Sequence, residues 1–307
     1  MTTTRAGLIV NPVAGADRAL DHQARLRDSL SERFGPIDVI VTSGPGDAER
    51  AARQAVGDGC THLFVAGGDG TLNEALNGVS SRAHGLEQVT FGVIPLGTGN
   101  DFARTLGIPV EVDDAIAVIT RGDVVQVDAG RLNDRIFVNV SGGGFIAEVS
   151  EAVTPQLKSI AGRLAYLVGG AQTLLDFEPV RMTLTAEPGG ERIGAGVHAF
   201  AVCNSRMIGG GRLIAPHAII DDGLLDVCVI DAMPALEFVA LLRLVAAGDH
   251  TDDPRVRYLR ASRATMQFDR RILVNTDGEV LETDRCEYEV LPRAVRFFAA
   301  WAPDAEG

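Results

Sequence analysis

Short, mainly apolar segments alternate with helical stretches through the first third of the chain, and this alternation limits the folds that the sequence can adopt. A helix is indicated before the second segment, because Leu26, Leu30 and Phe34 recur every four residues. Asp17 is placed to cap that helix. Strands that are apolar on both faces need helices on both sides, which is typical of a parallel sheet. The predicted strands are Ala6–Val10, Ile37–Thr42, His62–Ala66 and Thr90–Pro95.

From about Val124 the pattern changes to strands separated by Gly, Pro and Asp turns. Two helices interrupt these strands, and the second begins at Pro234 and runs to about Ala247. The first carries an apolar stripe, which either packs in the core, the favoured reading, or lines a lipid pocket. The stripe consists of Ile160, Leu164, Leu167, Val168, Ala171 and Leu175. The predicted strands are Val124–Asn133, Arg135–Ser141, Val180–Glu187, Gly194–Asn204, Leu225–Asp231, Ala264–Asp269 and Arg285–Leu291.

The change of pattern falls near Asp128–Arg131, and no flexible linker marks it. A chain of 307 residues is long enough for two domains that share a cleft. We therefore expect an α/β domain with a parallel sheet over residues 1–130, and a β-rich, antiparallel, sandwich-like domain over residues 131–292. The tail, from about residue 293 to residue 307, is expected to pack back on the first domain.

The formal net charge of −13 argues against non-specific binding to nucleic acid and against general attraction to anionic membranes. Residues 255–271 are a local exception, because their only acidic residue is Asp269. These residues form either a solvated basic face on paired strands, which the pattern favours, or a patch that meets a lipid surface. The basic residues are Arg255, Arg257, Arg260, Arg263, Arg270 and Arg271.

The cysteines are widely spaced and show no CxxC pattern, so we expect free core thiols rather than disulfides or zinc ligands. They are Cys60, Cys203, Cys228 and Cys286. The apolar run Ala6–Val10 is too short for a secretory signal, and no run approaches the ~18 apolar residues of a spanning helix. These features predict a cytoplasmic protein.

The strongest indication of chemistry is the segment Gly67–Gly78, with the sequence GGDGTLNEALNG, directly after a predicted strand. Two adjacent glycines allow a sharp turn whose N–H groups can face a phosphate, and the start of the next helix adds partial positive charge. Asp69 would repel that phosphate unless a cation such as Mg²⁺ lies between them. By itself, this segment favours the simpler reading of Asp69 as a helix N-cap.

A second turn of the same kind follows the strand Thr90–Pro95. Leu96–Asp101, with the sequence LGTGND, again combines two glycines, a hydroxyl and a carboxylate where a strand leads to a helix. The first strand ends in Asn11–Gly15 and the second in Thr42–Asp47, each a routine turn signal alone. Because such turns lie at one edge of a parallel sheet, the four loops together could surround a nucleotide.

These segments, in this order and spacing, resemble the diacylglycerol kinase catalytic domain family of lipid kinases, in particular the soluble bacterial diacylglycerol kinases. The resemblance is carried by NPVAG, GGDGTLNEALNG and PLGTGNDFAR in the first half. It continues through Ala215–Ala218, Asp221–Asp226 and Asp277–Glu279, so that it covers the whole chain. Where the family often has Ser or Thr and then Lys after NP, this chain has Ala14 and Ala16, which puts one phosphate contact in doubt.

The resemblance implies a role for each matching position. Asp69 and Asp101 would act on the phosphates through Mg²⁺, and Glu279 would be the general base. A second, structural Mg²⁺ site would use Asp222, the carbonyl groups of Ile219 and Leu224, and Asp128 through water. The residues that would hold ATP are Asn11, Pro12, Gly15, Thr42, Gly67, Gly68, Asp69, Gly70, Thr71, Leu72, Asn73 and Thr98. Without the family, Glu279 reads as a solvated carboxylate after a plain turn.

The implied function is transfer of the γ-phosphate of ATP to the hydroxyl of diacylglycerol or a related lipid, which gives phosphatidic acid. Such an enzyme would be cytoplasmic and would visit the inner face of the membrane, and a homodimer stays open. One alternative is an NAD kinase, which shares the GGDGT turn but also needs a Thr-Pro-Thr-Gly-Ser type segment that is absent here. Another is a non-catalytic lipid-binding protein, which would not need the acidic set Asp69, Asp101, Asp222 and Glu279.

Overall fold

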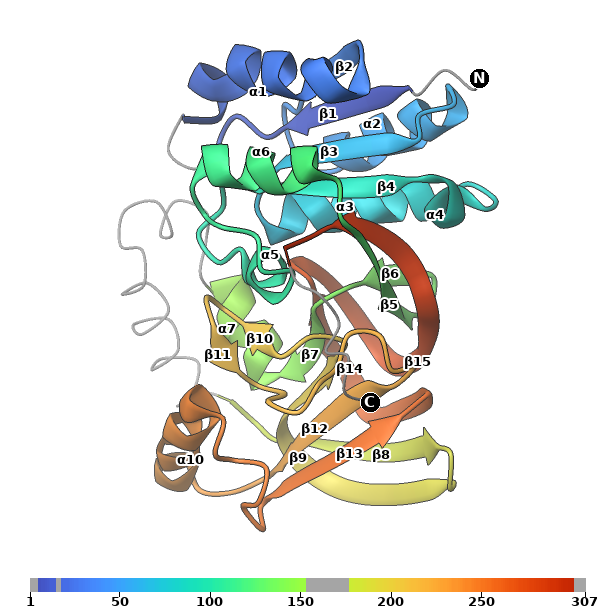
Figure 1. Ribbon diagram of the computed structural model, residues 1–307. Helices are drawn as coiled ribbons and strands as arrows, with labels where there is room; N and C mark the ends of the chain where they lie inside the picture. Colours follow the sequence, from blue (N-terminus) through green and yellow to red (C-terminus); the bar gives the residue numbers. More distant parts are fainter. Residues whose placement is uncertain (1–4, 15–17, 153–176, 301–307) are drawn as a thin grey trace.

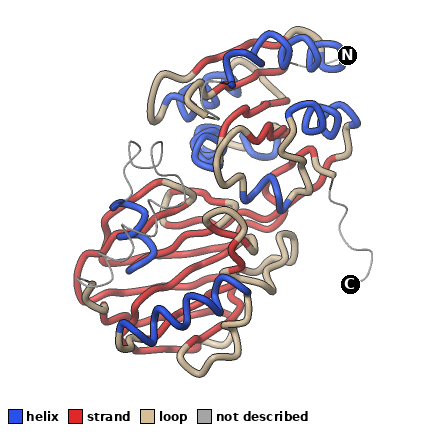
Figure 2. The backbone as a smooth tube through the Cα atoms, turned by 90° about the vertical axis from the view of Figure 1, so that its left-hand side faces the viewer, coloured by secondary structure: helices blue, strands red, loops and turns tan. Residues whose placement is uncertain are grey.

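The computed structural model describes residues 5–14, 18–152 and 177–300 of the chain (Figure 1). Asp17, Gly15, Ala16 and the predicted helix with the apolar stripe from Ile160 to Leu175 lie outside these residues. Within them, a region of alternating strands and helices is followed by a region built mainly of strands (Figure 2).

The first region contains β1 Ala6–Val10, β2 Ile37–Val41, β3 His62–Gly67 and β4 Thr90–Pro95. Their order in the sheet is β4-β3-β1-β2, and every pairing among them is parallel. Each strand agrees with a predicted one to within one residue at either end. The agreement follows from their apolar composition, since Leu8, Ile9 and Val10, for example, are fully buried.

Helices cover both faces of these strands (Figure 1). They are α1 Arg18–Phe34, α2 Asp47–Gly57, α3 Asp69–Ser80, α4 Gly85–Gln88, α5 Asp101–Thr105 and α6 Val112–Arg121. On one face, Leu26 and Leu30 of α1 pack in the same cluster as Ile119 of α6. On the other face, Ala52 of α2 and Leu76 of α3 belong to a second cluster.

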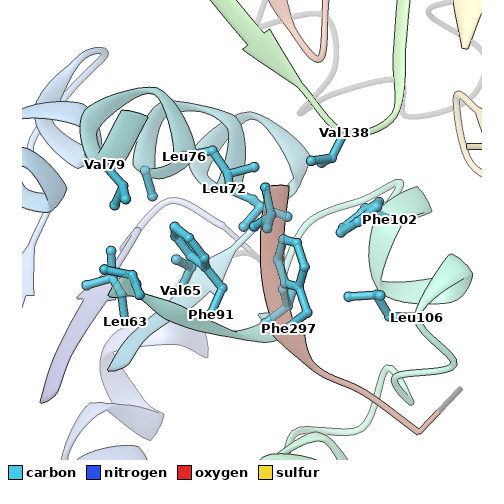
Figure 3. Packing of buried hydrophobic residues seen from close by; sticks show 14 of the residues in the cluster. Leu63, Val65, Leu72, Leu76, Val79, Phe91, Phe102, Leu106, Val138 and Phe297 are labelled. Atoms are coloured by element: carbon cyan, nitrogen blue, oxygen red, sulfur yellow. The ribbon is translucent and has the colours of Figure 1, made fainter. Parts of the chain in front are cut away.

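Figure 3 shows how α3 is held on the sheet. Leu72 and Leu76 lie between the helix and the strands, in the cluster that contains Phe91 and Phe297. The ring of Phe297 also packs edge-on against Phe102 of α5, with ring centroids 5.0 Å apart. Phe297 comes from the end of the chain, so the last strand completes the core of the first region.

In its described residues, 124–152 and 177–300, the second region consists of antiparallel strands and two helices. Its helices are α7 Phe145–Ala152 and α10 Ala235–Ala247. Its strands are β5 Val124–Leu132, β6 Arg135–Phe137, β7 Val140–Gly144, β8 Val180–Glu187, β9 Glu191–Cys203, β10 Met207–Ile208, β11 Arg212–Leu213, β12 Leu225–Asp231, β13 Val256–Ala261, β14 Arg263–Thr276 and β15 Glu279–Phe298. The predicted helix after Pro234 is confirmed as α10.

β15 joins the two regions, and in Figure 1 it is the long red strand that bends from one into the other. Its first half pairs antiparallel with β14, and its second half, with Arg296 and Phe297, lies between β5 and β4. The register with β5 shifts between Leu291 and Val295, around Pro292, which cannot donate to the ladder. The described strands therefore form one 13-stranded sheet of mixed direction, apart from the small β10-β11 hairpin.

Two predicted strands are too short. The prediction Ala264–Asp269 covers only part of β14, and Arg285–Leu291 covers only part of β15. The first prediction ends at Asp269, but β14 continues through the charged residues 269–271. The register with β15 shifts between Gln267 and Ile272, which leaves these charged residues at the surface.

The second region has two apolar clusters, as expected for packed layers. One lies among the strands and includes Phe200 and Met266. The other lies under α7 and α10, where the rings of Phe145 and Phe238 meet edge-on with centroids 5.1 Å apart. All four cysteines are free and buried, which confirms their prediction. Among the described residues, no helix has the length and apolarity needed to cross a membrane.

Five of the six arginines of residues 255–271 are paired with carboxylates, and Arg270 donates to the backbone carbonyl of Glu178. Arg257 binds Asp231 at 3.1 Å, and Arg263 binds Glu289 at 2.7 Å. In the same stretch, further pairs join Arg255 to Asp253 and Glu237, Arg260 to Asp222 and Asp226, and Arg271 to Glu282. This pairing supports the interpretation as charged, solvated strands.

Candidate active site

The loops that follow β1, β2, β3 and β4 meet at one edge of these parallel strands. There the side-chain amide of Asn11 donates to Thr71 Oγ1 over 2.9 Å, and its Oδ1 accepts the N–H of Val13. Thr42 is buried, and its N–H donates to the carbonyl of Val10 over 2.9 Å. A direct contact thus brings together the predicted loops after β1 and β3.

The two glycine turns, Gly67–Gly68 and Gly97–Gly99, touch through their backbones. A Cβ on Gly97 would lie 2.6 Å from the Cα of Gly68, closer than real Cβ atoms approach a backbone. The side chain of Asn100 fixes the second turn, because it accepts the N–H of Gly97 over 2.9 Å and donates to its carbonyl over 2.8 Å. Only glycine allows this approach, so the sequence motif is explained by packing as well as by any phosphate.

Asp69 and Asp101 begin α3 and α5, and their carboxylates converge at Gly99. A Cβ on Gly99 would lie 3.2 Å from Asp69 Oδ2 and 3.4 Å from Asp101 Oδ2. Asp69 accepts the N–H groups of Asp101 and Phe102, each over 3.2 Å. Asp69 is therefore a helix cap, but for α5 rather than for its own helix. The same geometry brings together the two carboxylates predicted to act on phosphates.

The surroundings of Asp69 favour a cation beside it. Burial raises the pKa of Asp69, the N–H of Phe102 opposes the rise, and the negative charge of Asp101 adds to it. A raised pKa means that the charged carboxylate is disfavoured as it stands, and a divalent cation would favour it. Carboxylate oxygens are the ligands that Mg²⁺ prefers. The residues at this point thus fit a magnesium ion.

A hairpin of the second region holds Asp101, and the sequence analysis missed it. At the tip of the β10-β11 hairpin, Gly209, Gly210 and Gly211 have φ values of 62°, 87° and 96°. The N–H of Gly210 lies 3.0 Å from Asp101 Oδ2, and the N–H of Gly211 lies 2.7 Å from Oδ1. Successive backbone N–H groups in a turn can together bind an anion. The run of three glycines was the signal that could have found this contact.

Asn139 is a second contact from the β-rich region that the sequence analysis missed. Its side-chain Nδ2 lies 3.5 Å from Asp69 Oδ1, and its Oδ1 accepts the hydroxyl of Ser205 over 2.7 Å. Both Asn139 and Ser205 are buried. The hydroxyl therefore fixes the amide so that its NH₂ group faces Asp69. An Asn beside a strand gives no local signal of such a contact.

Asp277 was read as a plain turn residue, but its carboxylate is buried and bonded. It accepts the N–H groups of Val138, Asn139 and Val140 over 2.8, 3.0 and 2.9 Å. Burial raises the pKa of Asp277 to about 6, against the lowering effect of these donors. The bonds also explain why the predicted strand Arg135–Ser141 is wrong as one piece. The chain leaves the ladder at this point, so that the strand divides into β6 and β7.

Glu279 is the first residue of β15, and Arg135 holds its carboxylate. Arg135 donates from Nη2 to Glu279 Oε1 over 2.5 Å and from Nε to Oε2 over 3.0 Å. From Nη1 it also donates to Glu49 of α2 over 3.0 Å. The Glu279 side chain is 34% exposed, so it is neither buried nor freely solvated. Sequence reasoning did not single out Arg135 or Glu49.

Two further side chains of the α3 segment have structural roles. Glu74 accepts the N–H groups of Gly46 and Ala48 over 2.9 and 3.1 Å, so that it caps the start of α2. Asn77 pairs with both backbone groups of Ile136, each over 2.9 Å, as a neighbouring strand would. α3 is thereby fixed to α2 and to the second region at once.

The remaining residues predicted to bind ATP differ in exposure. Thr98 and Gly70 are exposed, and Pro12 is half-buried. Leu72 packs in the core under α3, and Asn73 is buried with its Nδ2 3.4 Å from a backbone carbonyl of the β14-β15 turn. The side chains of Leu72 and Asn73 thus support the helix that begins at the edge.

The residues predicted for the structural magnesium site lie on one loop and the strand beside it. Asp128 is fully buried and accepts the N–H of Gly223 over 2.6 Å, so it reaches the loop directly. Burial raises the pKa of Asp128, and the charge of Asp221 adds to the rise. Asp222 accepts the N–H of Leu224 over 3.0 Å. The exposed Ile219 lies on the same loop.

The donors around this loop suit a hard cation, with one restriction. Carboxylate and carbonyl oxygens are typical Mg²⁺ ligands. Within the described residues, however, no three His, Cys, Asp or Glu side chains gather as a metal site, and the predicted set has only one directly ligating carboxylate. The restriction is Arg260, which contacts the other oxygen of Asp222. A cation at Asp222 would compete with this arginine.

Residues 5–132 match the diacylglycerol kinase catalytic domain. Residues 139–299 match the YegS C-terminal NAD kinase beta sandwich-like domain. A diacylglycerol kinase of Bacillus subtilis (strain 168) is 31% identical over 276 residues, which cover 90% of this chain and 89% of that protein. A diacylglycerol kinase of Staphylococcus aureus (strain MRSA252) is 33% identical over 278 residues, which cover 90% and 86%.

Crystal structures from Bacillus anthracis str. Sterne share the fold. One aligns with a TM-score of 0.82 and 26% identity over 99% of this chain and 97% of that one. Another, of a diacylglycerol kinase, has a TM-score of 0.79 and 25% identity over 99% of both chains. Since the similarity spans both regions and the paired aspartates are in place, the chain belongs to the diacylglycerol kinase catalytic domain family, and it is a kinase.

Proposed function

We propose that the chain is a Mg²⁺-dependent lipid kinase that transfers the γ-phosphate of ATP to the hydroxyl of diacylglycerol, with phosphatidic acid as product. The convergence of the Asp69 and Asp101 carboxylates at Gly99, between two glycine turns, carries the proposal. Phosphoryl transfer requires mainly positioning and neutralisation of charge, and this arrangement serves both. The lipid is proposed because relatives that cover most of the chain are diacylglycerol kinases.

ATP would lie at the edge where the β1, β2, β3 and β4 loops meet. The start of α3 directs its free N–H groups and partial positive charge to that edge, which favours phosphate oxygens. Asn11 and Thr71, bonded to each other there, would border the nucleotide. Residues 1–130 with the tail would thus form the nucleotide domain, and residues 131–292 would hold the lipid.

The carboxylates of the site would have three separate roles in the proposed reaction. Asp69 and Asp101 would hold Mg²⁺, which when bound neutralises charge on the phosphates. Glu279 would accept the proton of the lipid hydroxyl while the hydroxyl oxygen bonds to the γ-phosphorus. The bond from that phosphorus to the bridging oxygen breaks, and ADP leaves. Asp222 and Asp128, with the carbonyls of the 219–224 loop, would hold a second, structural Mg²⁺.

Incubation with radiolabelled ATP, Mg²⁺ and diacylglycerol in mixed micelles tests the proposal. The expected result is labelled phosphatidic acid on thin-layer chromatography, and no label with Asp69→Asn. Parallel reactions with other hydroxyl-bearing lipids such as ceramide and phosphatidylglycerol define the acceptor. In a further parallel reaction with NAD as the acceptor, label on NAD instead of lipid would identify an NAD kinase. Co-sedimentation with lipid vesicles without transfer to any acceptor would identify a binding protein. Either result contradicts the proposal.

The cellular location follows from the substrate. A kinase that uses ATP and a bilayer lipid would work from the cytoplasm at the inner face of the membrane. Because five of the six arginines of residues 255–271 lie in ion pairs, this stretch offers little free charge for anionic lipid. Vesicle binding that is unaffected by salt is therefore expected, and a steep fall with salt would contradict this expectation.

A further inference from the structure

We propose that Arg135 is the positioning residue for Glu279, and that Glu49 balances the charge of Arg135 when Glu279 takes up a proton. The inference rests on the proposed role of Glu279 as general base. It adds two residues, one from each domain, to which no motif assigns a function.

The guanidinium of Arg135 faces two carboxylates from elements far apart in sequence. It forks onto both oxygens of Glu279, at 2.5 and 3.0 Å, and reaches Glu49 with its third nitrogen at 3.0 Å. The three side chains are 26%, 34% and 21% exposed, so water shields their charges only in part. Arg53 binds the other oxygen of Glu49 at 2.7 Å and fixes that carboxylate in turn.

A bidentate fork sets the orientation of a carboxylate, because planar guanidinium and planar carboxylate share two parallel bonds. Glu279 needs this support, since it follows a tight turn in which Asp277 and Gly278 have φ values of 47° and 98°. The turn lies against the start of α3, where a Cβ on Gly278 would be 3.7 Å from the Cα of Gly70. Arg135 therefore holds Glu279 beside the helix that carries Asp69.

The charge of Arg135 alone would oppose proton uptake by Glu279, because a cation favours the charged carboxylate. The negative charge of Glu49 offsets part of this effect of Arg135 on proton uptake by Glu279. When Glu279 becomes neutral, Arg135 keeps a charged partner, so no cation is left unpaired in a half-buried site. The charged groups on the elements around Glu279 are Arg135 of β6, Glu49 and Arg53 of α2, Asp277 of its own turn, and Asp69 at the start of α3.

The pH dependence of turnover tests the proposal, because the two substitutions should act in opposite directions. Arg135→Gln should lower kcat by about 100-fold and move the acid limb of the profile up by about one pH unit. Glu49→Gln should move the same limb down by a similar amount, since Arg135 then has Glu279 as its sole carboxylate. Arg135→Lys should restore the position of the acid limb but only part of the rate, because an ammonium group cannot make the two parallel hydrogen bonds of a guanidinium to a carboxylate.

A purely structural ion pair predicts other results. It would lower the melting temperature in Arg135→Gln and Glu49→Gln and leave the acid limb where it is in both, and that outcome overturns the proposal. Arg131→Gln, which breaks the pair with Glu289 on β15, is the matched control and should leave the limb unmoved. If the wild type phosphorylates no acceptor, the proposed function itself fails. If it does and the limbs do not move apart, only the role of Arg135 and Glu49 fails.

Discussion

Asp69, the first residue of α3, accepts the backbone N–H of Asp101, the first residue of α5, over 3.2 Å. Two helix starts are thereby tied together at the edge of the parallel strands. The contact places two carboxylates near each other, which costs free energy unless a cation or hydrogen-bond donors compensate. The hairpin glycines donate to Asp101 and the amide of Asn139 faces Asp69. Groups of the second domain thus surround the pair.

Asp69→Asn should lower kcat/KM at least 100-fold, because a neutral amide binds Mg²⁺ more weakly than a carboxylate does. It should also lower stability by about 1 kcal/mol, since the amide oxygen can replace only one of the two capping bonds to α5. Asp113→Asn on the exposed side of α6 makes the same chemical change away from the site. Equal activity of the two variants would remove Asp69 from the mechanism.

Glu279→Gln should lower kcat by about 100-fold and leave the KM for ATP unchanged, as expected for loss of a general base. The neutral amide can keep a single bond to Arg135, so the fold should be retained. Glu282→Gln, on the same strand and exposed, is the control. Steady-state kinetics with both substrates varied gives the two constants. Near-normal turnover in a folded Glu279→Gln protein would mean that another group takes the proton.

Gly97→Ala should destabilise the protein by about 1–3 kcal/mol and weaken ATP binding, because the new methyl meets the backbone of Gly68 at 2.6 Å. Gly44→Ala is the matched control, since no atom lies within 4 Å of its Cβ position. Thermal unfolding and nucleotide titration measure the two effects. A normal melting temperature for Gly97→Ala would show that the two turns can separate without cost.

The strands of the first domain could be predicted almost to the residue because their signal is local. Ala6–Val10 is apolar and buried throughout, and Thr90–Pro95 is buried throughout and apolar after Thr90. The helix after Pro234 was found for the same reason, since Pro at its start is a local mark. The glycine turns and their aspartates were found because their composition is unusual beside a strand.

The contacts that complete the site could not be predicted, because they depend on distant partners. Asp277 has the local sequence of a solvated turn, yet its carboxylate binds a segment 138 residues earlier in the chain. Glu279 and Arg135 are 144 residues apart, and no local sequence pattern at either residue predicts their contact. The prediction that a strand ends at Asp269, beside charged residues, was wrong for a related reason. A register shift can keep charges at the surface without ending the strand.

Asp222→Ala should lower stability and remove the stabilisation that Mg²⁺ provides through the 219–224 loop. A ligand that binds only the folded state raises stability by about 2.7 kcal/mol at 100 times its Kd. Excess Mg²⁺ should therefore raise the melting temperature of the wild type more than that of the variant. Asp231→Ala, which also deprives an arginine of its partner, is the control. Equal Mg²⁺ shifts in all three proteins would reduce Asp222 to a turn residue.

Asp277→Asn should make stability less dependent on pH between about 4 and 6. Burial raises the pKa of Asp277 from 3.8 to about 6, so the folded state binds a proton more tightly than the unfolded state. The contribution of this group is thus greatest below pH 4 and is lost as the pH rises to 6, by up to about 3 kcal/mol.

Chemical denaturation at pH 4, 5, 6 and 7 gives the difference in unfolding free energy between wild type and variant. That difference should change in favour of the wild type as the pH falls, because the variant cannot take up the proton. Asp269→Asn, on the exposed part of β14, is the control and should follow the wild type. A constant difference across this range would show that Asp277 stays ionised, and that the three N–H groups which it accepts outweigh its burial.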